Sequence, residues 1–450
     1  MLFALLLALA APTDWAPARW AWDDPQSLEL LGESPINCLL LEKASAEFNT
    51  AARDRGIATL RVVRPDANLA DAAGEAAAQH FTGLLLEGDF PDGAAAGLRS
   101  SSKLAIIELT SRARMDVESD QPVIGTFQGV WAGIQVQPDG HAKAGPTGSP
   151  WIDTNSGFLR SARPYTKATI WLGQVPPQDT IIGAARYAQV IADAAIAGGR
   201  WVVALDSRFS DRLYARDAAA LKDWGVINTV LRFYEQRREF RDLVPYGALA
   251  LVQDIHGGAL LSGGVLDMIA VKHTPVRPIP RQQLSPEALK GASMAVNVDA
   301  GSLTPEQREI LRAFARGGGT LLTGPPAWKD QSEIKPGQIT LEKEELERLN
   351  EIWRDVQSMI GRRNLGARLF NVSSMLSNLV ASADGKQVYL HLVNFADYPV
   401  ETVTVYLTGQ YRQATLLTPD GERKLEVYKT EDGSGVDIDK VSLAATLRLE

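Results

Sequence analysis

Four carboxylates stand at or near the ends of apolar runs. Glu42 ends PINCLLLE, Glu87 lies in FTGLLLEGDF, Glu108 lies in LAIIELTSR, and Asp206 ends WVVALD. If these runs are parallel strands, their carboxyl ends share one edge, which is where parallel barrels build their active sites. Glycoside hydrolysis needs two carboxyl groups there, one protonated and one ionised. For each acid the alternative is a salt-bridged or helix-capping carboxylate. Asp206 is a first candidate because a fully apolar run precedes it.

The loop from Ala144 to Phe158, AGPTGSPWIDTNSGF, is the least ordinary stretch of the chain. Its prolines and glycines restrict the backbone, as in loops that hold ligands. Trp151 would stack on a sugar ring, while Asp153 and Asn155 would hydrogen-bond hydroxyls or reach the scissile bond. Asp153 therefore joins Asp206 as a first candidate for catalysis. The alternative is that Asp153 or Asn155 caps the helix that follows.

Two further residues are candidates for substrate binding. Trp131, in QGVWAGIQ, would form a second aromatic platform, with core packing as the alternative interpretation. The second candidate for substrate binding is Asp89, which lies two residues beyond Glu87 in the same run.

Composition argues against several classes of function. The five histidines show no paired spacing and Cys38 is the single cysteine, so we expect no metal site and no internal disulfide. No phosphate-binding loop and no G-x-S-x-G motif occur, and we expect no cofactor. A net charge of −8 without a long basic run argues against nucleic acid as a partner.

The elements that must position these residues alternate between apolar runs and helical stretches from residue 35 to about 210. This alternation predicts a parallel sheet with helical crossovers, and we assign residues 20–243 to a (β/α)8-like barrel that carries the catalytic site. Seven strands are recognisable, so either an eighth lies near Trp20 to Leu31 or the barrel is degenerate. An open doubly wound sheet is the alternative.

The pattern restarts after the barrel. Residues 244–330 predict a flavodoxin-like α/β domain, whose helix LTPEQREILRAFARGGG has Thr304 as N-cap and Gln307 placed to close a capping box. Residues 331–368 predict a helical connector. From 369 to 450 the hydrophobic period changes to two, which predicts a small antiparallel β-sandwich.

An apolar run from Leu2 to Ala10, followed by small residues, opens the chain. It predicts a secretory signal over residues 1–11, cleaved near Ala-Leu-Ala, and hence a secreted or periplasmic protein. No Lys or Arg precedes the run, so a buried N-terminal segment is the alternative. No later stretch reaches the roughly 18 apolar residues of a membrane span.

The order of these units resembles that of multidomain bacterial glycoside hydrolases, with a beta-galactosidase-like barrel, a glutamine-amidotransferase-like middle domain and a C-terminal β domain. The stretches GALALVQD, AVNVD and LRAFARGGGTLLTG carry the resemblance, supported by GPTGSPWIDTN and GGRWVVALD. It implies hydrolysis of O-glycosyl bonds in a carbohydrate. The middle domain has no cysteine, so amidotransferase chemistry is excluded and this domain would be structural or an assembly surface for a homo-oligomer.

The leading hypothesis is an exported glycoside hydrolase with Asp206 and Asp153 as first candidates and Glu87, Glu108 and Glu42 as alternates. A sugar-binding pseudoenzyme would keep the tryptophans but lack two carboxyl groups at a workable distance. A cell-envelope scaffold, marked by an exposed apolar patch, is the third hypothesis.

Overall fold

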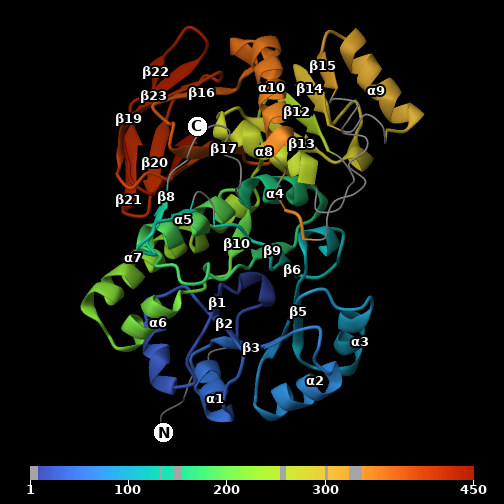
Figure 1. The fold of residues 1–450 in the computed structure, drawn as a ribbon. Coiled ribbons are helices and arrows are strands. Elements are labelled where there is room, and N and C mark those ends of the chain that lie inside the picture. Colours follow the sequence, from blue (N-terminus) through green and yellow to red (C-terminus); the bar gives the residue numbers. More distant parts are fainter. Residues whose placement is uncertain are drawn as a thin grey trace.

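The computed structural model describes residues 9–131, 134–144, 155–253, 260–298, 303–323, 337–339, 341 and 343–450. Figure 1 shows an N-terminal part in blue to green, a middle part in yellow to orange and a C-terminal part in red. Parallel sheets build the first two parts and antiparallel sheets the third, which confirms a mixed α/β architecture of several parts. Within the described residues, no helix is long and apolar enough to cross a membrane.

Parallel strands form the framework of the N-terminal part. Five pair in the order β1-β2-β3-β4-β5 and three in the order β10-β9-β6. Two isolated parallel bridges link the sheets, Thr110 with Thr126 and Ala18 with Val203. The strands are β1 (Pro17–Arg19), β2 (Cys38–Leu41), β3 (Ala58–Val63), β4 (Gly83–Glu87), β5 (Ala105–Leu109), β6 (Val123–Thr126), β9 (Thr169–Leu172) and β10 (Gly199–Trp201).

The strand β1 lies just before the region in which an eighth strand was expected. That region instead holds the 3-10 helix Pro25–Leu31, whose N-cap Asp24 accepts a hydrogen bond from the backbone of Gln26. A short antiparallel hairpin, β7 (Ile134–Val136) with β8 (Ala142–Ala144), follows β6.

Helices separate the parallel strands, as the alternating pattern predicts. Side chains cap several of them: Ser45 caps α1, Asn68 caps α2, and Asp217 caps α7. Arg216, with φ of 58°, and Asp217 separate α6 from α7. The helices are α1 (Ala46–Asp54), α2 (Leu69–Ala78), α3 (Ala94–Ser101), α4 (Asn155–Ala162), α5 (Ala184–Ala195), α6 (Ser207–Tyr214) and α7 (Ala218–Glu235).

Alternate side chains of the strands enter two different apolar clusters, because successive residues of a strand point to opposite faces. Leu40, Leu60 and Leu85 belong to a cluster, called here the inner cluster, made mainly of strand residues. Leu84 and Ile106 belong to a larger cluster shared with the helices, called here the helix-side cluster. The face on which a strand residue lies therefore decides whether it meets the helices.

The middle part is a parallel sheet with the order β13-β12-β14-β15. The predicted capping box at the start of α9 is confirmed, since Thr304 and Gln307 bond each other's backbone N–H groups. The elements are β12 (Leu249–Val252), α8 (Leu260–Val271), β13 (Val276–Ile279), β14 (Met294–Asn297), α9 (Pro305–Arg316), β15 (Thr320–Thr323) and the connecting helix α10 (Lys343–Ile360).

The C-terminal part contains two antiparallel sheets, ordered β11-β17-β18-β24-β20-β21 and β16-β19-β23-β22. Both contribute to one apolar core, for example through Leu390 and Val405. Its strands are β16 (Ala367–Phe370), β17 (Met375–Ala381), β18 (Val388–Asn394), β19 (Val400–Leu407), β20 (Ala414–Thr418), β21 (Gly421–Leu425), β22 (Tyr428–Lys429), β23 (Ser434–Val441) and β24 (Ala444–Leu449), and β11 (Val244–Pro245) joins from upstream.

Candidate functional site

Four charged side chains meet at the carboxyl ends of the first four parallel strands. Arg19 ends β1, Glu42 follows β2, Arg64 follows β3, and Glu87 ends β4. The residues two positions before Glu42, Arg64 and Glu87 all belong to the inner cluster. The period of two therefore places these side chains on the inner face of the strands and away from the helices.

Arg64 holds the two carboxylates side by side. Its Nη1 and Nη2 atoms donate to the two oxygens of Glu42 over 2.7 and 2.8 Å, and Nη2 also lies 3.3 Å from Oε2 of Glu87. Arg19 forms an ion pair with the other oxygen of Glu87. Nη2 of Arg64 thus lies close to one oxygen of Glu42 and to one oxygen of Glu87. These two oxygens can be no farther apart than the two Nη2–oxygen distances added together.

The electrostatics of this cluster fix the charge of Glu42. The hydrogen bonds from Arg64 hold the pKa of the Glu42 carboxyl below its usual value, and Glu42 in turn raises the pKa of Arg64. The two carboxylates differ in access to solvent, because the side chain of Glu42 is 58% exposed and that of Glu87 only 12%.

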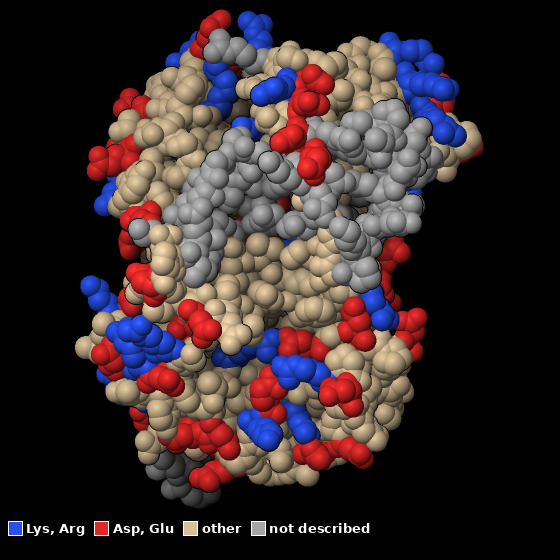
Figure 2. All heavy atoms as spheres, in the orientation of Figure 1, with Lys and Arg blue, Asp and Glu red and all other residues tan. Residues whose placement is uncertain are grey.

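A cavity of about 240 Å³ opens beside this cluster and is lined by Arg19, Glu42 and Arg64. Tryptophans supply much of the remaining wall. Trp20 and Trp22 meet edge to face with ring centres 4.7 Å apart, and Trp22 stacks on Tyr214 at 5.6 Å. On the face of the molecule drawn in Figure 2, positive and negative side chains are interspersed over the lower, N-terminal part. Aromatic faces next to fixed charges suit a polyhydroxylated ring, which needs both stacking and hydrogen bonds.

Asp206 lies in a different setting from these four residues. It caps α6 by accepting a hydrogen bond from the backbone N–H of Phe209 over 2.9 Å. Its other oxygen accepts from the hydroxyl of Tyr187 over 2.8 Å, and the whole residue is buried. Both oxygens are thus used within the protein, in the capping arrangement that the sequence offered as the alternative.

Glu108 and Asp89 also have partners within the chain. Glu108 lies on the same face of β5 as Ile106, a residue of the helix-side cluster, and pairs with Arg99 of α3 over 2.6 Å. Asp89 accepts a hydrogen bond from the backbone N–H of Ser111 over 2.8 Å. Neither lines the cavity beside Arg64, and Glu87 also lies behind its wall, joined to it through Arg19 and Arg64.

The predicted binding residues of the long loop fall partly outside the described residues, since Trp151 and Asp153 belong to the undescribed stretch 145–154. Asn155, at the start of α4, is buried, and its amide donates to the carbonyl of Val130 and to the carboxylate of Asp193 over 2.8 and 2.9 Å.

Trp131 is also a packing residue in this structure. It is 9% exposed and meets the rings of Tyr187 and Trp201 edge to face, each with ring centres 5.3 Å apart. Its indole N–H donates to the carbonyl of Val175 over 3.1 Å.

Sequence reasoning missed the basic and aromatic members of the site, namely Arg19, Arg64, Trp20 and Trp22. A usable signal existed for Arg64, because it follows the apolar run of β3 just as Glu42 follows β2. Arg19 had no such signal, since β1 contains only Pro-Ala-Arg. Within the described part of the chain no cluster of three or more metal-ligating side chains occurs.

No protein-family model matches the sequence, and no curated protein matches it either. Solved structures do resemble it. The alpha-L-fucosidase isoenzyme 2 from Paenibacillus thiaminolyticus superposes with a TM-score of 0.65 and 9% identity, covering 97% of this chain and 99% of that one. The beta-galactosidase from Rahnella sp. R3 gives a TM-score of 0.49 and 9% identity, with 98% and 97% covered. The chain thus has a glycosidase-like fold over nearly its whole length.

Proposed function

We propose that this protein is a glycoside hydrolase whose catalytic carboxylates are Glu42 and Glu87. The observation that carries the proposal is that Arg64 bonds both carboxylates beside a cavity walled by tryptophans. Because both carboxylates contact Nη2 of Arg64, they lie close enough together to fit the separation of roughly 5 to 9.5 Å between the paired carboxyl groups of glycosidases. The glycosidase-like fold adds support.

The two carboxylates take different roles. Glu42 is held ionised by Arg64 and acts as the base or nucleophile. Hydrolysis also needs a proton donor, and Glu87 takes this role once a bound sugar displaces Arg19 and Arg64 from its carboxylate and lets it protonate. Trp22 stacks on the sugar ring, the buried Trp20 supports Trp22 from behind, and Arg19 and Arg64 position the carboxylates and bond sugar hydroxyls.

This proposal includes a closed barrel. The bridge from Thr110 to Thr126 joins β5 to β6, and the bridge from Ala18 to Val203 joins β1 to the residues after β10. Backbone hydrogen bonds accompany both bridges, including Arg19 N–H to the carbonyl of Val203 over 2.7 Å. Linking the five-stranded and three-stranded sheets at both edges brings the carboxyl ends of all the strands around one opening.

The test is reducing-end release from polysaccharides and aryl glycosides by Glu42→Gln and Glu87→Gln. We expect each substitution to lower kcat/KM on the order of 10² to 10⁴-fold, the usual contribution of a positioned acid or base. Glu108→Gln is the matched control, because Glu108 is a strand carboxylate paired with an arginine on the helix side. Equal activity in all three variants would refute the assignment.

A carbohydrate-binding protein without catalysis is the second candidate. It is favoured by the engagement of Glu42 and Glu87 with arginines, since such pairs also occur in purely structural networks. This candidate would be supported by a glycan that binds to the protein but is cleaved neither by the wild type nor by any of the variants.

We also propose that the protein is exported through the apolar run at its start. The indole N–H of Trp15 donates to the carbonyl of Ala10 over 2.9 Å, so cleavage after residue 11 would remove that acceptor. N-terminal sequencing of protein recovered outside the cytoplasm tests the proposal. An uncleaved chain retained in the cytoplasm would contradict it.

A further inference from the structure

A second, larger hollow lies between α7 and the C-terminal part. It has a volume of about 860 Å³ and is lined by one face of α7, the turn after the 3-10 helix Pro25–Leu31, and the turns joining β20 to β21 and β23 to β24. We call it the α7 groove. Trp224 also borders the cavity at the strand ends, but it is only 4% exposed and forms a wall between the two hollows.

The α7 wall of the groove has a regular order of side chains. Lys222, Gly225, Thr229 and Arg232 all line it. Their spacing of three, four and three residues puts them on one face of the helix. At 1.5 Å per residue the two cations stand roughly 15 Å apart along the helix. Gly225 lies between them, and open space surrounds the position where its Cβ would be. This wall is an open trough with a cation at each end.

Positive charge exceeds negative charge in the groove. Two of its five cations, Arg216 and Arg423, are balanced by Glu29 at 3.2 Å and Asp439 at 2.7 Å. The other three cations have no carboxylate within ion-pair distance in the described part of the chain, and they are Lys222, Arg232 and Lys440.

Among the described residues, these three cations outnumber by one the carboxylates of the wall that form no ion pair, Glu33 and Asp420. The guanidinium of Arg232 is also fixed in place, since it donates to the carbonyl of Glu33 over 2.9 Å. This excess of positive charge occurs in a chain whose net charge is −8.

The groove offers hydrogen bonds in place of stacking. Thr229, Thr418 and Ser442 line it from both sides, and the aromatic residue of its wall, Trp224, is buried. The hydroxyls of Thr229 and Thr418 donate to the carbonyls of Gly225 and Gly421, so their oxygens face a ligand as acceptors. Lys440 lines the groove from the C-terminal part and Lys222 and Arg232 line it from α7, so an extended ligand would meet cations of both parts. A chain that carries both carboxylates and hydroxyl groups matches these cations and hydroxyl oxygens.

We propose that the α7 groove binds an acidic oligosaccharide, a chain bearing uronic acid groups, outside the catalytic cavity. The choice of a sugar chain over another anionic polymer rests on the proposed carbohydrate function. The cations and the open trough along α7 support the rest of the proposal, namely that the ligand is extended and negatively charged.

The test is calorimetric titration of the full chain with a tetramer of galacturonic acid, beside the neutral galactose tetramer. We expect the acidic tetramer to bind more tightly and to lose affinity as salt rises. Gly225→Phe fills the trough and should abolish binding. Gly74→Phe is the matched control, because Gly74 is a glycine of α2 that also faces open space. Lys222→Gln and Lys440→Gln should each weaken binding about fivefold, since exposed charge pairs contribute at most about 1 kcal/mol.

Three results would overturn the proposal. They are equal binding of both tetramers, unchanged affinity in Gly225→Phe, and equally tight binding of a tetraglutamate peptide at the same site. The double variant Glu42→Gln/Glu87→Gln separates this inference from the proposed function. We expect it to lose hydrolysis and keep the acidic tetramer bound in the groove.

Discussion

The two ends of the parallel strands both carry clusters of arginines and carboxylates, yet the clusters are built differently. At the carboxyl ends, Arg64 and Glu42 are 50% and 58% exposed and line a cavity of about 240 Å³. At the amino ends, Arg200 and Glu235 are 6% and 18% exposed, and the hollow beside them holds only about 20 Å³. The Arg64–Glu42 pair is thus open to a ligand at one end, whereas the Arg200–Glu235 pair at the other end is largely enclosed.

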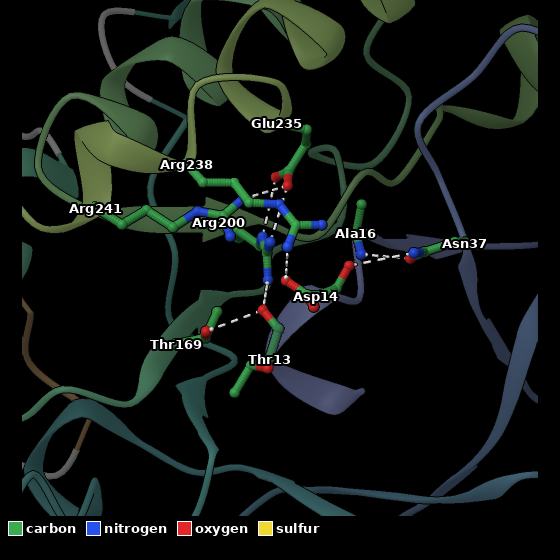
Figure 3. Close-up of polar contacts among 9 residues, drawn as sticks. All are labelled: Thr13, Asp14, Ala16, Asn37, Thr169, Arg200, Glu235, Arg238 and Arg241. Carbon is green, nitrogen blue, oxygen red and sulfur yellow. Dashed lines mark hydrogen bonds and ion pairs between the residues drawn. The ribbon is translucent and has the colours of Figure 1, made fainter. Parts of the chain in front are cut away.

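The cluster at the amino ends ties chain segments together (Figure 3). Arg200 pairs with Glu235 through two contacts of 2.9 and 2.8 Å and also donates to the carbonyl of Thr13. Thr169 donates to the same carbonyl over 3.3 Å, and Arg238 pairs with Asp14 over 3.1 Å. The first segment of the chain is thereby bound to the starts of β9 and β10.

This difference shows that clusters of arginines and carboxylates on the same set of strands can have two roles, stabilising the fold or bordering a site open to a ligand. Where a buried arginine such as Arg200 bonds a backbone carbonyl and a largely enclosed carboxylate, removal of the carboxylate leaves a buried charge without its partner and costs stability. Where arginines and carboxylates border an open cavity, their pairing contributes little to stability and a ligand can replace it. A stabilising cluster at the amino ends and an open one at the carboxyl ends is the division that the proposed barrel and its proposed active site predict.

A large loss of stability is expected from breaking the cluster at the amino ends. Glu235→Gln leaves the buried Arg200 without a carboxylate, so we expect the free energy of unfolding to fall by about 3 kcal/mol. Glu42→Gln at the other end should lower it by less than about 1 kcal/mol, because that pair is exposed. Urea denaturation of both variants checks the contrast. Equal losses of stability would remove the distinction between the two ends.

Two tryptophans, one at each end of the strands, give a second contrast, in which the substitution at the cavity has the smaller effect. Trp22→Ala removes part of the cavity wall, and we expect KM for a cleaved glycoside to rise about fivefold, in keeping with the roughly 1 kcal/mol of an aromatic contact. Trp15, near the amino ends, is 2% exposed within the inner cluster. Trp15→Ala should therefore reduce stability by about 3 to 5 kcal/mol. Steady-state kinetics and thermal unfolding of both variants test this, and an unchanged KM in Trp22→Ala would count against the sugar site.

The smallest expected effect concerns pH. Arg64 lowers the pKa of Glu42 below its ordinary value of 4.5, so the carboxylate stays ionised until the pH falls below that value. The stability that this pair contributes is present above the unfolded pKa and is lost as the pH falls through the folded pKa. In Arg64→Gln the acidic limb of kcat/KM should move upward toward 4.5. A limb that stays in place would show that Glu42 is not the titrating base.

Much of the framework could be predicted from the sequence, because its signals are local. The apolar runs of β2 to β5 and the capping box at Thr304 follow from period and residue type. The three-residue strand β1 was missed because it is too short to show a period and takes its place through hydrogen bonds to β2 and Val203.

The site could be predicted only in part. Glu42 and Glu87 were among the candidates because strand ends can be found from apolar runs. Their partners Arg19 and Arg64 were not, since side chains that meet across strands depend on the order in which the strands pair. Asp206 ranked first because its burial was predicted correctly, but burial did not reveal that both its oxygens would bond within the chain.

The most direct test of the central claim is azide rescue of carboxylate-deleted variants. Wild-type protein, Glu42→Ala, Glu87→Ala and Glu108→Ala are assayed with a cleaved aryl glycoside, with and without sodium azide. Azide is a small anion that can occupy the space of a deleted carboxylate and attack the sugar in its place. We predict that Glu42→Ala and Glu87→Ala lose activity, that azide restores it in Glu42→Ala, and that Glu108→Ala stays active throughout. Full activity of Glu42→Ala without azide would contradict the account.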